Sequence, residues 1–192
     1  MKFVLFSSVE SGSIEVSIKQ IGNKFVAVTF LTVMTFISHT ALAKEKADAW
    51  KNTAGKLTAM LVITDKPKEY TKKWSKDKDE LPIGMIVSTV KKSKLVVALV
   101  FFKGCGGDRY KRCDAEIKFS VYKPNGKLYA KRSGLSLWKN KVITSGLMLS
   151  QANLALSFDP KDPVGKYKVV VSIKDNISNK NMTLVRYLTV SG

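Results

Sequence analysis

Short strand-like runs separated by turn formers fill most of the chain, and they limit the folds that it can adopt. Residues 94–102, KLVVALVFF, are almost continuously apolar, which is typical of a central strand buried on both faces. Residues 115–122 alternate apolar and polar side chains, and the Asn-Gly pair at 125–126 then predicts a tight turn. About nine strands at short spacing predict an all-β sandwich. The other predicted strands cover residues 57–63, 84–90, 127–130, 136–138, 147–149, 153–158, 166–173 and 182–190.

The second half of the chain resembles bacterial immunoglobulin-like domains. The segments IKFSVYKPNGKLYAKRSGLSLW and DPVGKYKVVVSIKD are similar to macroglobulin-type modules, in which a Pro-Asn-Gly turn joins two strands and Gly-x-Tyr-x-Val opens a later one. The segment 102–105, Phe-Lys-Gly-Cys, with a second cysteine at 113, is similar to a group of uncharacterised exported proteins. The resemblance covers about residues 57–190 and implies an immunoglobulin-like β-sandwich of about 7–9 strands. It implies no activity, because nothing resembles a thioester or bait region.

Residues 65–74 have the pattern of one short helix after the first strand. Asp65 is placed to cap this helix, and Pro67 suits its first turn. Tyr70 and Trp74 then share one face, which we expect to pack on a sheet. A ring pair that binds a ligand is the alternative.

An apolar run at residues 25–37 has the length of the hydrophobic region of a signal peptide. Lys19 and Lys24 precede it, and small residues at its end predict cleavage between Ala43 and Lys44. An uncleaved membrane anchor is the alternative, but the run is shorter than the ~20 residues that span a bilayer.

Three regions are therefore expected along the chain. Residues 1–43 are a leader with a signal peptide, residues 44–56 a polar lead-in, and residues 57–192 one immunoglobulin-like sandwich domain. The processed protein is expected to be periplasmic or secreted, with no transmembrane anchor after processing.

Both cysteines lie in one short stretch, Cys105-GGDRYKR-Cys113. In an oxidising compartment two nearby cysteines usually pair, so we expect a structural disulfide. Closing so short a loop stabilises the fold by roughly 2.5 kcal/mol in the chain-entropy model. A redox-active pair and a metal site are the alternatives, but the Cys-x-x-Cys spacing and further ligands are missing.

The only histidine, His39, lies in the expected leader, which excludes histidine-based catalysis and histidine-ligated zinc in the processed protein. Carboxylates remain as candidate acids and bases. They lie in polar, turn-like stretches where capping or solvated charge is the ordinary explanation. We therefore expect no enzyme activity, no cofactor and no metal. The candidate carboxylates are Asp77, Asp79, Glu80, Asp159 and Asp162.

A strong excess of positive charge is the feature with the clearest functional meaning. The formal net charge is +18, and no acidic residue lies between Ile117 and Phe158. Clustered charge without acidic neighbours is typical of an anion-binding surface, whereas evenly spread charge only aids solubility. Trp138 and Tyr129 lie among the lysines and offer rings for stacking, or else belong to the core. The candidate basic surface consists of Lys118, Lys123, Lys127, Lys131, Arg132, Lys139, Lys141 and Trp138.

These observations favour a non-catalytic exported binding or scaffold module. Its expected partner is a protein or an anionic envelope component: lipopolysaccharide, phospholipid head groups or acidic polysaccharide. Nucleic acid is not the expected partner. A carboxylate-based hydrolase acting on cell-wall or polysaccharide material is one alternative, and a structural or chaperone subunit of a surface organelle is another.

Overall fold

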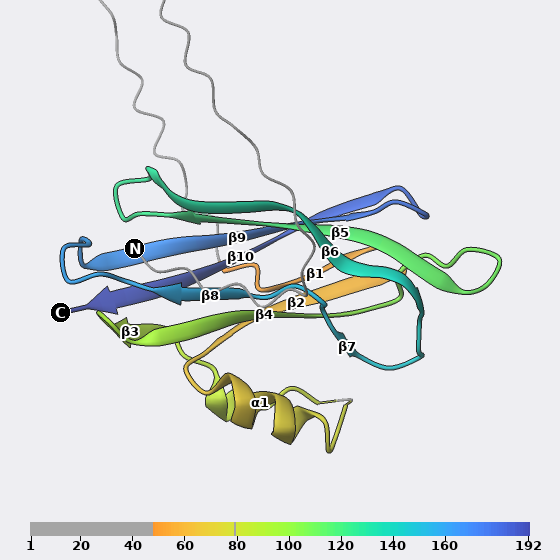
Figure 1. Cartoon of the computed structure of the whole chain (residues 1–192), viewed down its shortest axis with the longest axis horizontal. Helices are drawn as coiled ribbons and strands as arrows, with labels where there is room; N and C mark the ends of the chain where they lie inside the picture. Colours follow the sequence, from red (N-terminus) through yellow and green to blue (C-terminus); the bar gives the residue numbers. More distant parts are fainter. Residues whose placement is uncertain (1–47, 79) are drawn as a thin grey trace, which may run out of the picture. The chain divides into compact units, whose positions relative to one another are not determined.

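A computed structural model describes residues 48–78 and 80–192, and these form two β-sheets with one short helix (Figure 1). Sheet A consists of β1 (Lys51–Ala54), β2 (Leu57–Thr64), β4 (Leu95–Lys103), β7 (Met148–Leu149) and β8 (Leu154–Ser157). Sheet B runs in the order β3 (Thr89–Lys91), β10 (Lys180–Ser191), β9 (Gly165–Asp175), β5 (Arg112–Tyr122) and β6 (Leu128–Val142). The predicted all-β sandwich is confirmed. The leader and its cleavage site at Ala43 and Lys44 lie outside the described residues.

Alternating apolar side chains from both sheets form the main core. Along β5 the buried positions are every second residue apart from Ser120, which is buried as well, and β9 alternates throughout. As predicted, β4 is a central strand of sheet A, and its side chains are buried on both faces over most of its length. The inward side chains of β5 and β9 are Ala115, Ile117, Phe119, Val121, Tyr167, Val169, Val171 and Ile173.

The strand order is that of an immunoglobulin-type sandwich. The order β10-β9-β5-β6 corresponds to strands G-F-C-C′ of a variable-type domain, and β2, β4 and β8 correspond to strands A, B and E. All of these pairs are antiparallel, whereas β3 pairs in parallel with β10 at the sheet edge.

A short helix, α1 (Pro67–Trp74), covers the outer face of sheet A and creates a second apolar cluster (Figure 1). The ring centroids of Tyr70 and Trp74 lie 5.9 Å and 5.0 Å from that of Phe101 on β4. This confirms the predicted packing of the two rings on a sheet. The prediction that Asp65 caps the helix is wrong, because Lys66 occupies the N-cap position and no side chain caps it.

The segment expected only to lead into the fold contains strand β1, and the two residues just before β1 bond to both sheets at one side. The Leu61 N–H of β2 donates to the Trp50 carbonyl oxygen at 2.7 Å, and the Val185 N–H of β10 donates to the Ala49 carbonyl oxygen at 3.1 Å. Nonlocal backbone pairing therefore orders a stretch whose side chains are polar, so its hydropathy did not predict a strand.

Three other predicted strands have different limits. Residues 84–90 are divided between a 3₁₀ turn, Ile83–Met85, and the short strand β3, because Met85 and Ile86 pack into the cluster beneath α1. Residues 127–130 and 136–138 belong to one long strand, β6. Four register shifts let β6 keep its pairing with β5 across the polar residues between them.

Tyr167, near the start of β9, joins the core to the preceding loop. Its ring is fully buried, and its hydroxyl donates to the Pro163 carbonyl oxygen, four residues upstream, at 2.9 Å. A tyrosine with this backward hydrogen bond, the tyrosine corner, is a feature of Greek-key sandwiches. By contrast, the buried hydroxyl of Tyr70 has no hydrogen-bond partner among the described residues.

We predict that Tyr167→Phe lowers the free energy of unfolding by about 1 kcal/mol, because the Pro163 carbonyl loses its donor. The same substitution at Tyr70 should leave stability unchanged or raise it, since it removes an unpartnered buried hydroxyl. Urea denaturation of both variants measures the difference. Equal midpoints for the two variants would show that the corner hydrogen bond contributes nothing.

Candidate functional site

The predicted basic residues all lie on or beside the β5–β6 hairpin, but they occupy different parts of it. Lys118 on β5 is exposed on the outer face of sheet B, as is Lys131 on β6. Lys131 pairs in register with Ser120, which belongs to the same outer row of β5 as Lys118. These two lysines therefore share one face of the sheet.

Lys123 and Lys127 lie in the tight turn that joins β5 to β6. The turn is closed by the Lys123 N–H, which donates to the Lys127 carbonyl oxygen at 2.8 Å, and by Asn125, whose side-chain oxygen accepts from the Lys127 N–H at 3.1 Å. The Lys123 ammonium lies 5.4 Å from the ring centroid of Tyr129. That ring is packed against the core residues Phe158 and Tyr167, so it is not an open stacking surface.

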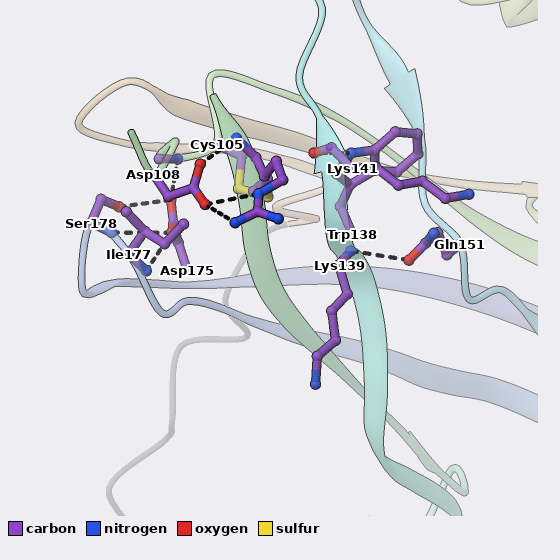
Figure 2. The surroundings of a disulfide bond; sticks show 12 residues. Cys105, Asp108, Trp138, Lys139, Lys141, Gln151, Asp175, Ile177 and Ser178 are labelled. Carbon is purple, nitrogen blue, oxygen red and sulfur yellow. Dashed lines mark hydrogen bonds and ion pairs between the residues drawn. A yellow bond between two sulfur atoms is a disulfide. The ribbon is translucent and has the colours of Figure 1, made fainter. Parts of the chain in front are cut away.

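Lys139 and Lys141 lie at the opposite end of β6, near the disulfide (Figure 2). Trp138 beside them is half-buried, and its ring centroid lies 5.7 Å from that of Phe102 in the core. Its indole N–H donates to the Lys141 carbonyl oxygen at 3.2 Å. Trp138 therefore packs against the core and bonds to the local backbone. This agrees with the alternative interpretation, in which its ring belongs to the core.

The charged residues of β6 have a structural explanation, because β6 is an edge strand of sheet B. Exposed edges invite pairing with other chains, and lysines and bulges are the usual protection. Lys127 and Lys141 are 14 residues apart along an extended strand, or about 45 Å at ~3.3 Å per residue. The sequence cluster therefore does not form one compact pocket.

The outer face of sheet B instead combines two of these lysines with three from β9. Lys168 pairs with Tyr122 and Lys174 with Glu116, in the same outer row as Lys118. The acidic groups at this surface are Asp114 and Glu116, in the same outer row of β5, and Asp48, whose pKa burial raises more than the nearby Lys166 charge lowers it. We call this surface the basic face; it comprises Lys118, Lys131, Lys166, Lys168 and Lys174.

The three lysines of β9 were not among the predicted site residues. A signal for them was present, because residues 166, 168 and 174 occupy the polar positions of the alternating run KYKVVVSIK. What the sequence did not indicate is that β9 lies directly beside β5 in the sheet. Only that pairing brings the two sets together.

The described candidate carboxylates do not form an acid–base pair in a cleft. Asp162 accepts hydrogen bonds from the Tyr129 hydroxyl at 2.6 Å and from the Asp159 N–H at 2.8 Å. Burial, and then the hydrogen bond to Asp162, raise the pKa of Tyr129. Asp77 and Glu80 are exposed, and Asp79 lies outside the described residues. Within 48–78 and 80–192, no group of three or more histidine, cysteine or acidic residues is arranged to hold a metal.

The predicted disulfide between Cys105 and Cys113 is confirmed, and it closes the loop between β4 and β5. A buried carboxylate, Asp175, ties this loop to the β9–β10 turn (Figure 2). Asp175 accepts from the Gly106 N–H at 2.6 Å, the Ser178 hydroxyl at 2.7 Å, and the N–H groups of Ile177 and Ser178 at 3.1 Å. Sequence reasoning missed this residue because one of its donors, the Gly106 N–H, comes from a loop 69 residues away.

Burial by itself would raise the pKa of Asp175, but the hydrogen bonds from Gly106, Ser178 and Ile177 outweigh it and hold the pKa below its ordinary value. The carboxylate is therefore charged at neutral pH, and no basic side chain of residues 48–78 and 80–192 forms an ion pair with it. Its charge is balanced by N–H and O–H dipoles alone.

No helix in the described part of the chain has the length and apolar character that crossing a membrane requires.

No protein family matches this sequence, and no curated protein is detectably similar to it. Among solved structures, the chain is similar to the C-terminal domain of Wzt, with 9% identity over 77% of this chain and 80% of that domain and a TM-score of 0.43. It is also similar to the CARDB domain of a Pyrococcus furiosus protein, with 19% identity over 54% and 80% and a TM-score of 0.31. A Niemann-Pick type C2 protein from the Japanese carpenter ant matches with 6% identity over 54% and 79% and a TM-score of 0.36. Likenesses this distant assign no function to the chain.

We predict that Asp175→Asn lowers the free energy of unfolding by about 2 kcal/mol at pH 7, because an amide nitrogen would face N–H donors. A lowered folded-state pKa stabilises the fold above the unfolded value of about 4. This stabilisation is lost as the pH falls through the folded value, so the variant should differ less from wild type at pH 3 than at pH 7. Urea denaturation at both values measures this.

The matched control for this prediction is Asp114→Asn, a half-buried carboxylate that makes no side-chain hydrogen bond with described residues. It should shift stability far less at either pH. A pH-independent difference between wild type and Asp175→Asn would contradict the proposed charge on Asp175.

Proposed function

We propose that this protein is a non-catalytic exported module that binds phosphate-bearing lipid head groups of the cell envelope through the basic face. The observation that carries the proposal is the placement of five lysines on three neighbouring strands of one sheet face. Phospholipid and lipopolysaccharide share the required chemistry, which is anionic phosphate displayed over an extended surface.

The shape of the basic face suits an extended surface better than a small molecule. From Lys166 to Lys174 it is about 26 Å long, at ~3.3 Å per residue, and neighbouring strands lie ~4.8 Å apart. The lysines are separated along it by short side chains such as Ser120 and Ser172. Several ammonium groups can thus contact separate phosphates at once, each contributing about 1 kcal/mol.

The carboxylate positions do not support the hydrolase alternative. Asp162 receives its hydrogen bonds from Tyr129 and the local backbone, and Asp77 and Glu80 are exposed. The organelle-subunit alternative would use a free strand edge. The long edge strand β6 is interrupted by register shifts and carries lysines, which opposes edge pairing.

We predict that Lys118→Gln, Lys168→Gln and Lys174→Gln together weaken binding to phosphatidylglycerol vesicles about 100-fold, from about 1 kcal/mol per lysine. Glutamine keeps most of each side chain's apolar stem in place. Co-sedimentation with vesicles at low and high salt measures binding. Wild-type binding should fall as salt rises, because exposed charges are screened over ~10 Å at 0.1 M and ~3 Å at 1 M.

The matched control is Lys68→Gln, Lys72→Gln and Lys76→Gln, which removes the same charge from exposed positions on and just after α1, over sheet A. This variant should bind almost as well as wild type. Equal losses in both triple variants would show that only net charge matters. Vesicles containing lipopolysaccharide distinguish the two lipid sources, and salt-independent binding would overturn the proposal.

A further inference from the structure

Four connections meet at one end of the sandwich and surround a hollow of about 710 Å³. They are the β1–β2 turn, the disulfide loop between β4 and β5, the segment after β6, and the β9–β10 turn; the last three lie at the right of Figure 1. Two of them match the B–C and F–G connections of a variable-type domain, and a third, the segment after β6, follows the C′ equivalent. Variable-type immunoglobulin domains use these loops to bind ligands. We call this hollow the loop-end pocket.

The charged side chains that line the loop-end pocket are mainly basic. They are Lys56, Lys111, Lys180 and Asp108. The carboxylate of Asp108 is already bound by the Arg112 guanidinium at 2.8 Å and 2.9 Å, so it does not neutralise the lysines. None of the three lysines forms an ion pair with a residue in the described part of the chain.

The walls of the loop-end pocket are held in place, and glycines supply part of them. The disulfide and Asp175 fix the loop that contains Gly104, Gly106 and Gly107. A Cβ on Gly104, whose φ is +74°, would lie 2.0 Å from the Lys56 carbonyl oxygen, so no side chain can occupy that position. A Cβ on Gly106 would meet Asp175 and Ser178 at 3.0–3.1 Å. A pocket with fixed walls avoids part of the ordering cost of binding.

We propose that the loop-end pocket binds a small phosphate-bearing saccharide. A phosphate monoester carries nearly two negative charges, and several lysines at one pocket suit it as point charges. The hollow is far larger than a phosphate group, and Leu57 and Ile143 supply apolar wall for an uncharged sugar body. This inference rests on residues that are separate from the basic face, so it extends the proposed function and does not depend on it.

The test is a titration of the oxidised full chain with glucose 1-phosphate, inorganic phosphate and glucose, followed by ¹H–¹⁵N NMR. Glucose 1-phosphate should shift the amide signals of Gly106, Gly107, Ser178 and Lys180, and glucose should shift none of them. Inorganic phosphate should shift the same signals at tenfold or higher concentration. Shifts confined to the basic face would overturn the pocket assignment, and inorganic phosphate binding as tightly as glucose 1-phosphate would overturn its saccharide part.

The variant for this pocket is Lys56→Gln with Lys111→Gln and Lys180→Gln, which should weaken glucose 1-phosphate binding at least tenfold. Its matched control is Lys118→Gln with Lys168→Gln and Lys174→Gln, which removes the same charge from the basic face and should keep pocket binding. Circular dichroism confirms that both variants fold. Equal weakening in the two variants would overturn the pocket. In the vesicle assay we expect the opposite pattern, in which the basic-face variant loses binding and the pocket variant keeps it. Failure of one proposal is therefore distinguishable from failure of the other.

Discussion

Alternate side chains of β5 and β9 are buried between the two sheets, and this burial decides what the remaining side chains can do. Phe119 and Val171 pair across the strands and face the core. Because side chains alternate along a strand, Lys118 and Ser172, the next pair, must face outward. The same apolar packing that stabilises the sandwich therefore aligns lysines from separate parts of the chain on one surface. The basic face follows from the geometry of the core.

The loop end is held by a different means, a buried carboxylate that hydrogen-bond donors surround. Asp175 receives hydrogen bonds from the disulfide loop and from the β9–β10 turn, so one carboxylate joins two loops at the end of the sandwich. The Cys105–Cys113 bond restricts the first of these loops independently. Together they hold glycine-rich backbone in one arrangement and leave a hollow at the end of the sandwich. Such rigid support is what a binding pocket needs and what core packing alone does not provide.

The large positive charge has different consequences in different places. On β6 it protects an edge strand, and the lysines at its two ends are too far apart to act on one ligand. On the outer face of sheet B it forms a broad surface, and at the loop end it lines an open hollow. Asp108 and Asp175 lie at the loop end, but Arg112 binds the first and backbone groups surround the second. The sign of the net charge therefore says less about where an anion can bind than the position of each carboxylate does.

From the sequence alone, the fold class, the central strand β4, the helix packed through Tyr70 and Trp74, and the Cys105–Cys113 bond could be predicted. Each depends on local periodicity or on short spacing, which a linear chain displays directly. The strand β1, the continuous β6 and the role of Asp175 could not be predicted, because backbone bonds between distant segments create them. The same reason explains which part of the candidate site could be predicted. The sequence identified an excess of lysine, but only the pairing of β5 with β9 and the meeting of four loops decided which lysines lie together.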